Sequence, residues 1–150
     1  MRVLVTGCFD ILHPGHIFLF QEAAKIGEVY VIVARDSTIE KWKKQRPVIP
    51  ELQRLEMIKA IKYVTYATLG NEHNNFLEKA LSLKPDLILL GPNQKISISK
   101  LKELLSEKHA EHIQVHRLEK LNTKFPLYSS SSIKKRIIEH FLEDQLKHEK

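Results

Sequence analysis

The sequence predicts an α/β protein: a single Rossmann-like, doubly wound domain with a five-stranded parallel sheet and helices on both faces. Two observations predict this fold. Short, almost purely apolar runs, typical of strands buried on both faces, alternate with stretches whose apolar residues recur at helical spacing. The unusual polar sequences follow the predicted strands, so they can all lie at the carboxyl edge of one sheet, where ligands bind in such folds. The 150 residues suit one domain, 1–150, and no repeat or linker divides them.

Five strands and five helices are predicted in alternation. The strands are Val3–Val5, Val29–Ala34, Tyr63–Leu69, Leu87–Leu90 and Ile113–Val115. The helices are His16–Ile26, one that begins near Pro50-Glu51 and includes Ile61, Asn74–Leu83, Ser99–Lys108, and an amphipathic C-terminal helix from about Ser130. In this last helix Ile133, Ile137 and Phe141 share a face, and residues 144–150 are expected to fray. Residues 35–46 are predicted as a loop or a short irregular piece, and the aperiodic residues 118–128 as a loop.

Composition limits the classes of protein that the chain can belong to. Its single cysteine, Cys8, excludes an intramolecular disulfide and fits a reducing compartment. No apolar stretch approaches the roughly 20 residues needed to span a bilayer, and the N-terminus shows no signal-peptide pattern. We therefore expect a soluble, cytoplasmic protein without a membrane partner. The formal net charge of +6 comes from basic residues spread along the chain with few aromatics among them, which favours an anionic substrate over nucleic acid.

The most informative segment is Gly7–His16, which reads Gly-Cys-Phe-Asp-Ile-Leu-His-Pro-Gly-His and follows the first strand. A strand that ends in a glycine turn and opens a helix aims unpaired backbone N–H groups at one point, where the helix dipole is positive. His13 and His16, three residues apart, lie on one face of that helix start and can donate to phosphate oxygens. The segment therefore predicts a site for nucleotide phosphates. A zinc site is the alternative, but the pair supplies only two ligands, and no nearby cysteine or histidine obviously completes the set.

The same segment resembles the first signature of the cytidylyltransferase-like nucleotidyltransferases, which share the His-x-Gly-His element with class I aminoacyl-tRNA synthetases. The resemblance continues through Arg54, through Leu90-Gly91-Pro92-Asn93-Gln94 and through the serine run at 129–132. Within the family, Ala34-Arg35-Asp36-Ser37-Thr38 and the serine run look most similar to archaeal FAD synthases, which are FMN adenylyltransferases. Glycerol-3-phosphate cytidylyltransferases come next. The family transfers a nucleoside monophosphate from a nucleoside triphosphate to a phosphate acceptor and releases pyrophosphate.

The resemblance implies a role for each matching residue. His13 and His16 would stabilise the charge that grows on the transferred phosphate, and Arg54 would reach the nucleotide phosphates with a bidentate guanidinium. Among the basic residues that follow the second strand, Lys44 or Lys43 is expected to lie over the triphosphate or the acceptor phosphate, with Lys41 less favoured. The other nucleotide-binding candidates are Cys8, Phe9, Asp10, Gly15, Gly91, Asn93, Gln94, Arg117, Ser131 and Ser132.

Several of these candidates keep two interpretations open. Asp10, expected as an exposed carboxylate near the nucleotide, could help to hold Mg²⁺ or could close an Asx turn. Cys8 stands where the family usually has a small hydroxyl residue and is interpreted as a space-filler, while the backbone N–H groups of Cys8 and Phe9 can still face the phosphates. Asn93 stands where FAD synthases tend to have aspartate, which weakens the assignment of base and acceptor.

The serine run and the loop before it are expected to complete the site. Ser131 and Ser132, at the start of the last helix, would bind the departing pyrophosphate, with Arg117 as their partner. Tyr128 and the Leu118–Tyr128 loop are candidates for lining an acceptor pocket. Because the acceptor phosphate is ionised at neutral pH, no general base is required, which explains why the motifs supply donors and cations.

The resulting hypothesis is a magnesium-dependent nucleotidyltransferase, in its most specific form one that converts ATP and FMN to FAD. Transfer from CTP to glycerol-3-phosphate or another polyol phosphate is the alternative within the class. A non-catalytic module that binds nucleotide or nucleic acid is the alternative outside it. Because the family is often dimeric, the resemblance also favours a homodimer.

Overall fold

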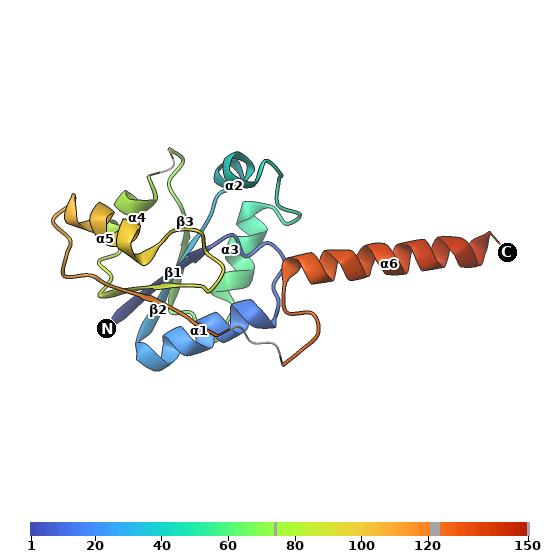
Figure 1. Cartoon of the computed structure of the whole chain (residues 1–150), viewed down its shortest axis with the longest axis horizontal. Coiled ribbons are helices and arrows are strands. Elements are labelled where there is room, and N and C mark those ends of the chain that lie inside the picture. The colour runs from blue at the N-terminus through green and yellow to red at the C-terminus, as the bar shows by residue number, and fades with distance from the viewer. Residues whose placement is uncertain (74, 121–123, 150) are drawn as a thin grey trace.

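The computed structural model describes residues 1–73, 75–120 and 124–149, and it contains one five-stranded sheet covered by helices (Figure 1). The strands are β1 (Arg2–Gly7), β2 (Glu28–Val33), β3 (Tyr66–Leu69), β4 (Leu87–Leu90) and β5 (Gln114–Arg117). The helices are α1 (Pro14–Ile26), α2 (Asp36–Lys43), α3 (Glu51–Lys59), α4 (Phe76–Ser82), α5 (Ile98–Ser106) and α6 (Ser130–His148). Among these helices, none has the length and apolar character that crossing a membrane requires.

β1 lies at the centre of the sheet, whose strand order is β3-β2-β1-β4-β5. Every neighbouring pair is parallel; Val3, for example, is in register with Val29 of β2 on one side and with Leu87 of β4 on the other. All five carboxyl ends therefore lie at one edge, and the strand order reverses between β1 and β4, the usual place for a ligand in an open α/β sheet. The predicted fold class and strand number are confirmed.

Alternate residues of the strands supply two separate cores. Val3 and Val5 pack with Phe20 of α1 and Ile58 of α3, whereas Leu4 belongs to the core beneath α4 and α5. Val3, Leu4 and Val5 are all completely buried. Because successive side chains of a strand point to opposite faces, a strand covered on both faces requires such an uninterrupted apolar run.

One segment predicted as a loop is a helix. Residues 36–43 form α2, in which only Thr38 and Ile39 are buried, while Trp42 is 67% exposed. A surface helix is recognised in a sequence by the apolar stripe that it buries, and α2 buries too few apolar residues to show one. The start of α2 is also fixed by a distant residue, because the Asp36 backbone N–H donates to the Glu51 carboxylate at 2.8 Å.

α6 projects away from the rest of the molecule, toward the right of Figure 1. Its sequence is amphipathic as predicted, yet none of its 19 residues is buried. Ile137 and Phe141, predicted to share a face, are 59% and 62% exposed. The helix continues to His148, through most of the residues for which the sequence predicts fraying.

Candidate active site

The predicted pair of histidines lies between the carboxyl end of β1 and the first turn of α1. His13 is the N-cap residue of α1, and its Nδ1 atom accepts a hydrogen bond from the Gly15 backbone N–H at 3.0 Å. In a neutral ring this leaves the proton on Nε2, which can donate to a ligand. The ring of His16 packs edge-on against Phe9, with the ring centroids 5.2 Å apart. Both imidazoles are thus held by contacts within the protein.

Both rings are neutral at physiological pH. They are stacked, with centroids 3.6 Å apart and planes inclined by 26°. Burial, with smaller contributions from His13 and Lys43, lowers the pKa of His16 to about 3, and burial also lowers the pKa of His13. The Nδ1 atom of His16 is buried and has no hydrogen-bond partner in the described part of the chain. Neutral imidazoles donate and accept hydrogen bonds at a phosphate without adding full charge to the site.

The zinc alternative needs a third ligand beside the histidine pair. Residues 1–73, 75–120 and 124–149 contain no group of three or more His, Cys, Asp or Glu residues that could hold a metal ion. Within those residues, His13 and His16 therefore stand as a pair rather than as part of a metal-ligand set.

The N-terminus of α6 lies directly against the histidine segment. A Cβ atom placed on Gly15 would lie 2.9 Å from the backbone carbonyl oxygen of Tyr128, a distance that real Cβ atoms do not keep. The Ser130 hydroxyl lies 3.5 Å from the Ile11 carbonyl oxygen. Glycine between the two histidines thus permits a close backbone approach that any larger residue would block. The convergence of these distant segments at one edge of the sheet is as predicted.

The serine run begins α6 with a capping box. The Ser132 backbone N–H donates to the Ser129 hydroxyl at 3.1 Å, and the Ser129 N–H donates to the Ser132 hydroxyl at 3.3 Å. The hydroxyl of Ser132 is therefore engaged within the cap, whereas Ser131 is exposed. The two serines predicted to bind pyrophosphate therefore differ. Ser132 takes part in the helix cap, and Ser131 is exposed to solvent. The positive end of the helix dipole is available to an anion here.

Asp10 is not the exposed carboxylate that the sequence predicts. It is only 8% exposed, and its two oxygens accept hydrogen bonds from the backbone N–H groups of Val48 at 3.0 Å and Ile49 at 2.8 Å. The ammonium group of Lys134 in α6 lies 3.5 Å from the same carboxylate. The partners of Asp10 are remote in sequence, so its local pattern does not reveal them. Asp10 ties the β1–α1 turn to the segment before α3 and to α6, rather than closing a local turn.

Arg54 is also placed differently from the predicted phosphate contact, because it is 1% exposed. Its Nε donates to the Ile49 carbonyl at 2.8 Å, and one Nη donates to the carbonyls of Cys8 at 2.6 Å and Ala34 at 2.8 Å. The other Nη forms a 2.6 Å ion pair with Asp36. The guanidinium fork thus holds together the loops that follow β1 and β2. A surface position in the first turn of α3, inferred from sequence, cannot anticipate this burial.

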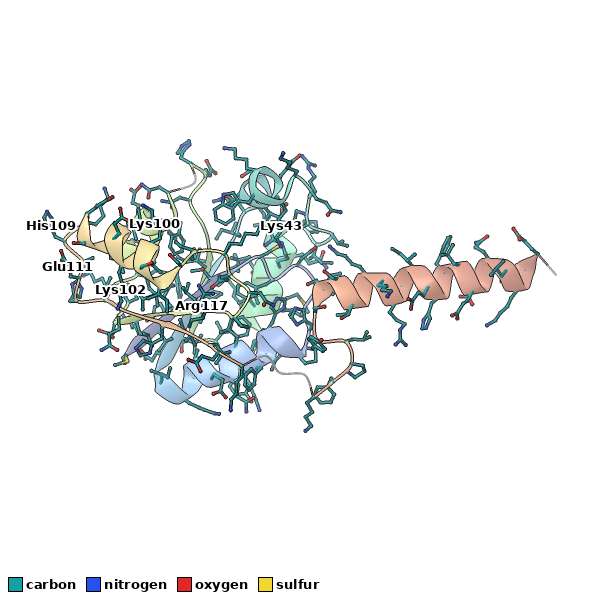
Figure 2. All side chains as sticks on the ribbon, viewed as in Figure 1. Lys43, Lys100, Lys102, His109, Glu111 and Arg117 are labelled. Atoms are coloured by element: carbon teal, nitrogen blue, oxygen red, sulfur yellow. The ribbon has the colours of Figure 1, made fainter. Side chains whose placement is uncertain are left out.

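Gln94 and Arg117 hold the loop that follows β4. Gln94 accepts a hydrogen bond from the Gly91 backbone N–H at 2.8 Å and donates to the Thr6 carbonyl at 2.7 Å. Arg117, at the end of β5 (Figure 2), donates from one Nη to the carbonyls of Gly91 and Gln94, each at 2.9 Å. Both predicted nucleotide-binding side chains are therefore used to fix the loop, while Asn93 remains exposed. The loop is rigidly placed beside the β1–β4 edge.

Of the basic residues after β2, Lys43 is the one whose charge acts on the site. Burial raises the pKa of the Cys8 thiol, and the charge of Lys43 opposes that rise. Lys43 also adds to the effect of burial in lowering the pKa of His16. Lys44, the other candidate, is the C-cap residue of α2 in a left-handed conformation; both lysines are exposed. Lys43, labelled in Figure 2, is therefore the candidate cation whose charge reaches Cys8 and His16.

The turn between β1 and α1 holds its backbone in an uncommon conformation. Phe9 has a φ of 51°, and its ring is buried against Phe20 and His16. Such strain in a residue with a side chain costs about 1–3 kcal/mol and clusters at functional sites. Among the described residues, no protein acceptor pairs with the backbone N–H groups of Cys8 and Phe9. These two donors stay the predicted backbone contacts for a phosphate.

A cavity of about 700 Å³ adjoins His13. Its apolar walls come from Leu12, Ile17 and Phe18 around the start of α1 and from Phe125 in the loop before α6. Lys124 lines it as well. Two residues of the loop 118–128 thus line this cavity, whereas Tyr128, the residue named from the sequence, is not among its lining residues. Residues 121–123 lie outside the described residues. The sequence analysis did not identify Ile17 and Phe18 as pocket residues. The one available signal was Phe18, an aromatic residue outside the apolar face that α1 turns toward the core.

Comparison with known proteins places this site in a family. Residues 4–136 match the family model described as cytidylyltransferase-like. The FAD synthase of Methanohalophilus mahii is 46% identical over 139 residues, which cover 92% of this chain and 94% of that protein. The FAD synthase of Methanopyrus kandleri is 41% identical over 150 residues, which cover 97% of each chain.

A solved structure agrees with these sequence matches. The lipopolysaccharide core biosynthesis protein from Thermoplasma volcanium superposes with a TM-score of 0.77 at 36% identity, covering 81% of this chain and 98% of that one. The family match spans the histidine pair, the Gly91–Gln94 loop and the start of α6. The chain therefore belongs to the cytidylyltransferase-like family of nucleotidyltransferases.

Proposed function

We propose that this chain is an FAD synthase, which transfers the AMP group of ATP to FMN and releases pyrophosphate. The observation that carries the proposal is the convergence of His13 and His16 with the N-terminus of α6 at the carboxyl edge of β1. Relatives that carry the name FAD synthase match nearly the whole chain, at 46% identity in M. mahii and 41% in M. kandleri. These matches favour adenylyl transfer to a flavin phosphate over the other reactions of the family.

The reaction is a displacement at the α-phosphorus of ATP. An oxygen of the FMN phosphate forms a bond to this phosphorus while the bond from the phosphorus to the bridging oxygen of the β-phosphate breaks. The electron pair of the broken bond leaves with pyrophosphate. Since the attacking oxygen is already ionised at neutral pH, the protein contributes positioning and charge stabilisation rather than a general base.

Each part of the site has a task in this displacement. The Nε2–H of His13 and the neutral ring of His16 bind oxygens of the α-phosphate, where negative charge grows in the transition state. The N-terminus of α6 and the Ser131 hydroxyl bind the departing pyrophosphate. Lys43 supplies a cation from α2. Arg54 acts indirectly, because its hydrogen bonds fix the turn that carries the backbone donors.

The cavity beside His13 is proposed to hold the flavin ring. A flat aromatic ring system is well suited to walls formed by Leu12, Ile17, Phe18 and Phe125. Because His13 lines the same cavity, a ring bound there can place its phosphate beside the histidine pair. A small polyol phosphate lacks the apolar surface to cover these walls, which favours FMN over glycerol-3-phosphate as the acceptor.

Magnesium is proposed to enter with the triphosphate. Mg²⁺ keeps several waters and is commonly held by substrate phosphates together with one or two carboxylates. Asp10 does not fit as such a ligand, since its oxygens are engaged by Val48, Ile49 and Lys134. No step of the proposed reaction is therefore assigned to a protein-bound metal.

A substrate panel tests the proposal. The purified chain is incubated with MgCl₂ and with ATP or CTP, each combined with FMN, riboflavin or glycerol-3-phosphate, and both pyrophosphate and FAD are quantified. We expect pyrophosphate release that requires ATP and FMN together, with one FAD formed per pyrophosphate, and no FAD from riboflavin, which lacks the attacking phosphate. Pyrophosphate release only with CTP and glycerol-3-phosphate would show that these, and not ATP and FMN, are the substrates. If no pair gives product and the chain binds RNA tightly, the chain is a binding module rather than an enzyme.

A further inference from the structure

α6 presents an apolar surface that the rest of the chain leaves uncovered. Ile137, Ile138, Phe141, Leu142 and Leu146 are each between 55% and 63% exposed. Figure 2 shows α6 surrounded by its own side chains, with no other element alongside most of its length. Helices in proteins normally gain most of their stability by packing an amphipathic face, since isolated helices are marginal in water. Most of this surface also lies beyond the family match, which ends at residue 136.

We propose that α6 pairs with α6 of a second copy of this chain in a crossed, antiparallel arrangement. The apolar residues of α6 are symmetric about a midpoint between residues 139 and 140: position 133 pairs with 146, 137 with 142, and 138 with 141. A two-fold interface requires such self-complementarity, because the same patch on both copies must fit itself. In an antiparallel pair, each apolar residue lies level with an apolar residue of the partner helix.

The spacing of these residues also predicts how the helices cross. They form two rows at i, i+4 spacing: Ile133, Ile137 and Phe141, and beside them Ile138, Leu142 and Leu146. Rows of this kind interdigitate when two helices cross at about −50°. A long coiled coil would need the alternating three- and four-residue spacing that α6 lacks. The contact is therefore expected to centre on Ile137, Ile138, Phe141 and Leu142.

The charges of α6 favour the antiparallel orientation. Lys135 and Arg136 precede the centre of the apolar patch, and Glu143 and Asp144 follow it. An antiparallel partner brings the basic end of one helix level with the acidic end of the other, whereas a parallel partner would bring like charges together. Within its own helix Lys135 has only an exposed partner, Glu139, at 4.0 Å.

The same charges argue against a lipid surface as the occupant. Residues 130–149 contain four basic and four acidic side chains, so the helix carries no net charge when its histidines are neutral. Helices that lie on membranes typically carry a polar face rich in Lys and Arg, which attracts anionic lipid. A second copy of the chain is the occupant that fits both the apolar spacing and the charge distribution.

Sedimentation equilibrium of the full chain at micromolar concentrations tests the pairing. We expect a dimer whose dissociation constant rises by at least about 30-fold in Phe141→Glu, as for an interface hot spot. Ile26→Glu is the matched control, because Ile26 is 43% exposed at the last residue of α1, at the end of that helix opposite the start of α6, and should leave the dimer intact. Circular dichroism confirms that both variants fold. A monomeric wild-type chain, a dimer indifferent to Phe141→Glu, or a monomer that binds lipid vesicles would each overturn the proposal.

A cross-linking experiment tests the orientation, in a Cys8→Ala background that removes the single native thiol. Ile138 lies near the two-fold point, so a short bis-maleimide should join two chains that carry Ile138→Cys. Leu146 is level with residue 133 of an antiparallel partner, which separates two Leu146→Cys thiols by about 20 Å along the helix. We expect cross-linking of the first variant and not of the second. Equal cross-linking of both would indicate a parallel pair and contradict the proposal. Neither experiment depends on the proposed reaction.

Discussion

His13 and His16 form a stacked pair whose ring centroids lie 3.6 Å apart, and burial lowers the pKa of both rings. The pair therefore meets a triphosphate as two neutral rings rather than as two cations. The positive charge of the site comes instead from Lys43 and from the starts of α1 and α6. The groups that direct hydrogen bonds are thus separate from those that supply positive charge.

Replacing His16 by glutamine should lower kcat by about 10²–10³-fold, because removal of one preorganised donor from comparable oxyanion sites has this effect. The free energy of unfolding at pH 7 should change little. Steady-state kinetics and urea unfolding measure the two quantities on the same sample. His112→Gln, at an exposed turn, is the control and should change neither. A parallel loss of activity and stability in His16→Gln would make the histidine a structural residue.

Stability should fall in acid through His16. Its pKa is about 3 in the folded chain and near 6.5 in the unfolded chain. Between these values the unfolded chain binds a proton that the folded chain does not, so the free energy of unfolding is undiminished above pH 6.5 and decreases as the pH drops toward 3. The loss attributable to this residue is of the order of a few kcal/mol. Urea midpoints at pH 7 and pH 4.5 should therefore differ less for His16→Gln than for the wild type; equal differences would contradict the burial of this ring.

Gly15→Ala should damage both stability and activity. The added Cβ would lie 2.9 Å from the Tyr128 carbonyl oxygen, a backbone atom that cannot rotate away. Forced overpacking of this kind costs about 1–3 kcal/mol, and the displaced start of α6 should raise KM for ATP. Gly70→Ala is the matched control, since its Cβ would come no closer than 3.6 Å to a neighbouring atom. If Gly15→Ala binds ATP and unfolds as the wild type does, α6 does not dock against the histidine turn as described.

Arg54→Lys should destabilise the fold by about 1–3 kcal/mol, because buried carbonyl oxygens lose their hydrogen-bond donors. A lysine cannot supply the fork that reaches Asp36 and the carbonyls of Cys8, Ala34 and Ile49. Thermal unfolding measures the loss, and Arg46→Ala serves as the exposed control, because the Arg46 side chain is 79% exposed. A fully stable Arg54→Lys whose only defect is a raised KM for ATP would instead restore the direct phosphate contact predicted from the sequence.

The sequence predicts the sheet well and the contacts of individual charged residues poorly, for a physical reason. Uninterrupted apolar runs such as Leu87–Leu90 have few alternatives to a buried parallel strand. The His-Pro-Gly-His segment is similarly local, since its geometry follows from a strand, a turn and a helix start. The structure has the strand and the helix start at the predicted residues. Both could be predicted because the residues that determine them are neighbours in the chain.

Asp10 and Arg54 show where prediction from the sequence fails. Each is a charged residue in a matched motif, and each is buried by partners that lie about 40 residues or more away in sequence, as between Asp10 and Val48 or Arg54 and Cys8. Nothing in the local pattern distinguishes a charge that meets a ligand from one that braces a loop. The helical state of residues 36–43 was missed for the same reason, because contacts with Glu51 help to fix its start.

The position of the bound triphosphate distinguishes the proposed phosphate contacts from any other arrangement. A crystal structure of the chain with a non-hydrolysable ATP analogue and Mg²⁺ would locate each phosphate. We predict that the α-phosphate lies within hydrogen-bonding distance of His13 or His16 and that the terminal phosphates lie at the N-terminus of α6 near Ser131. A triphosphate bound elsewhere, with the histidine pair and the serine run both out of contact, would contradict the proposed site.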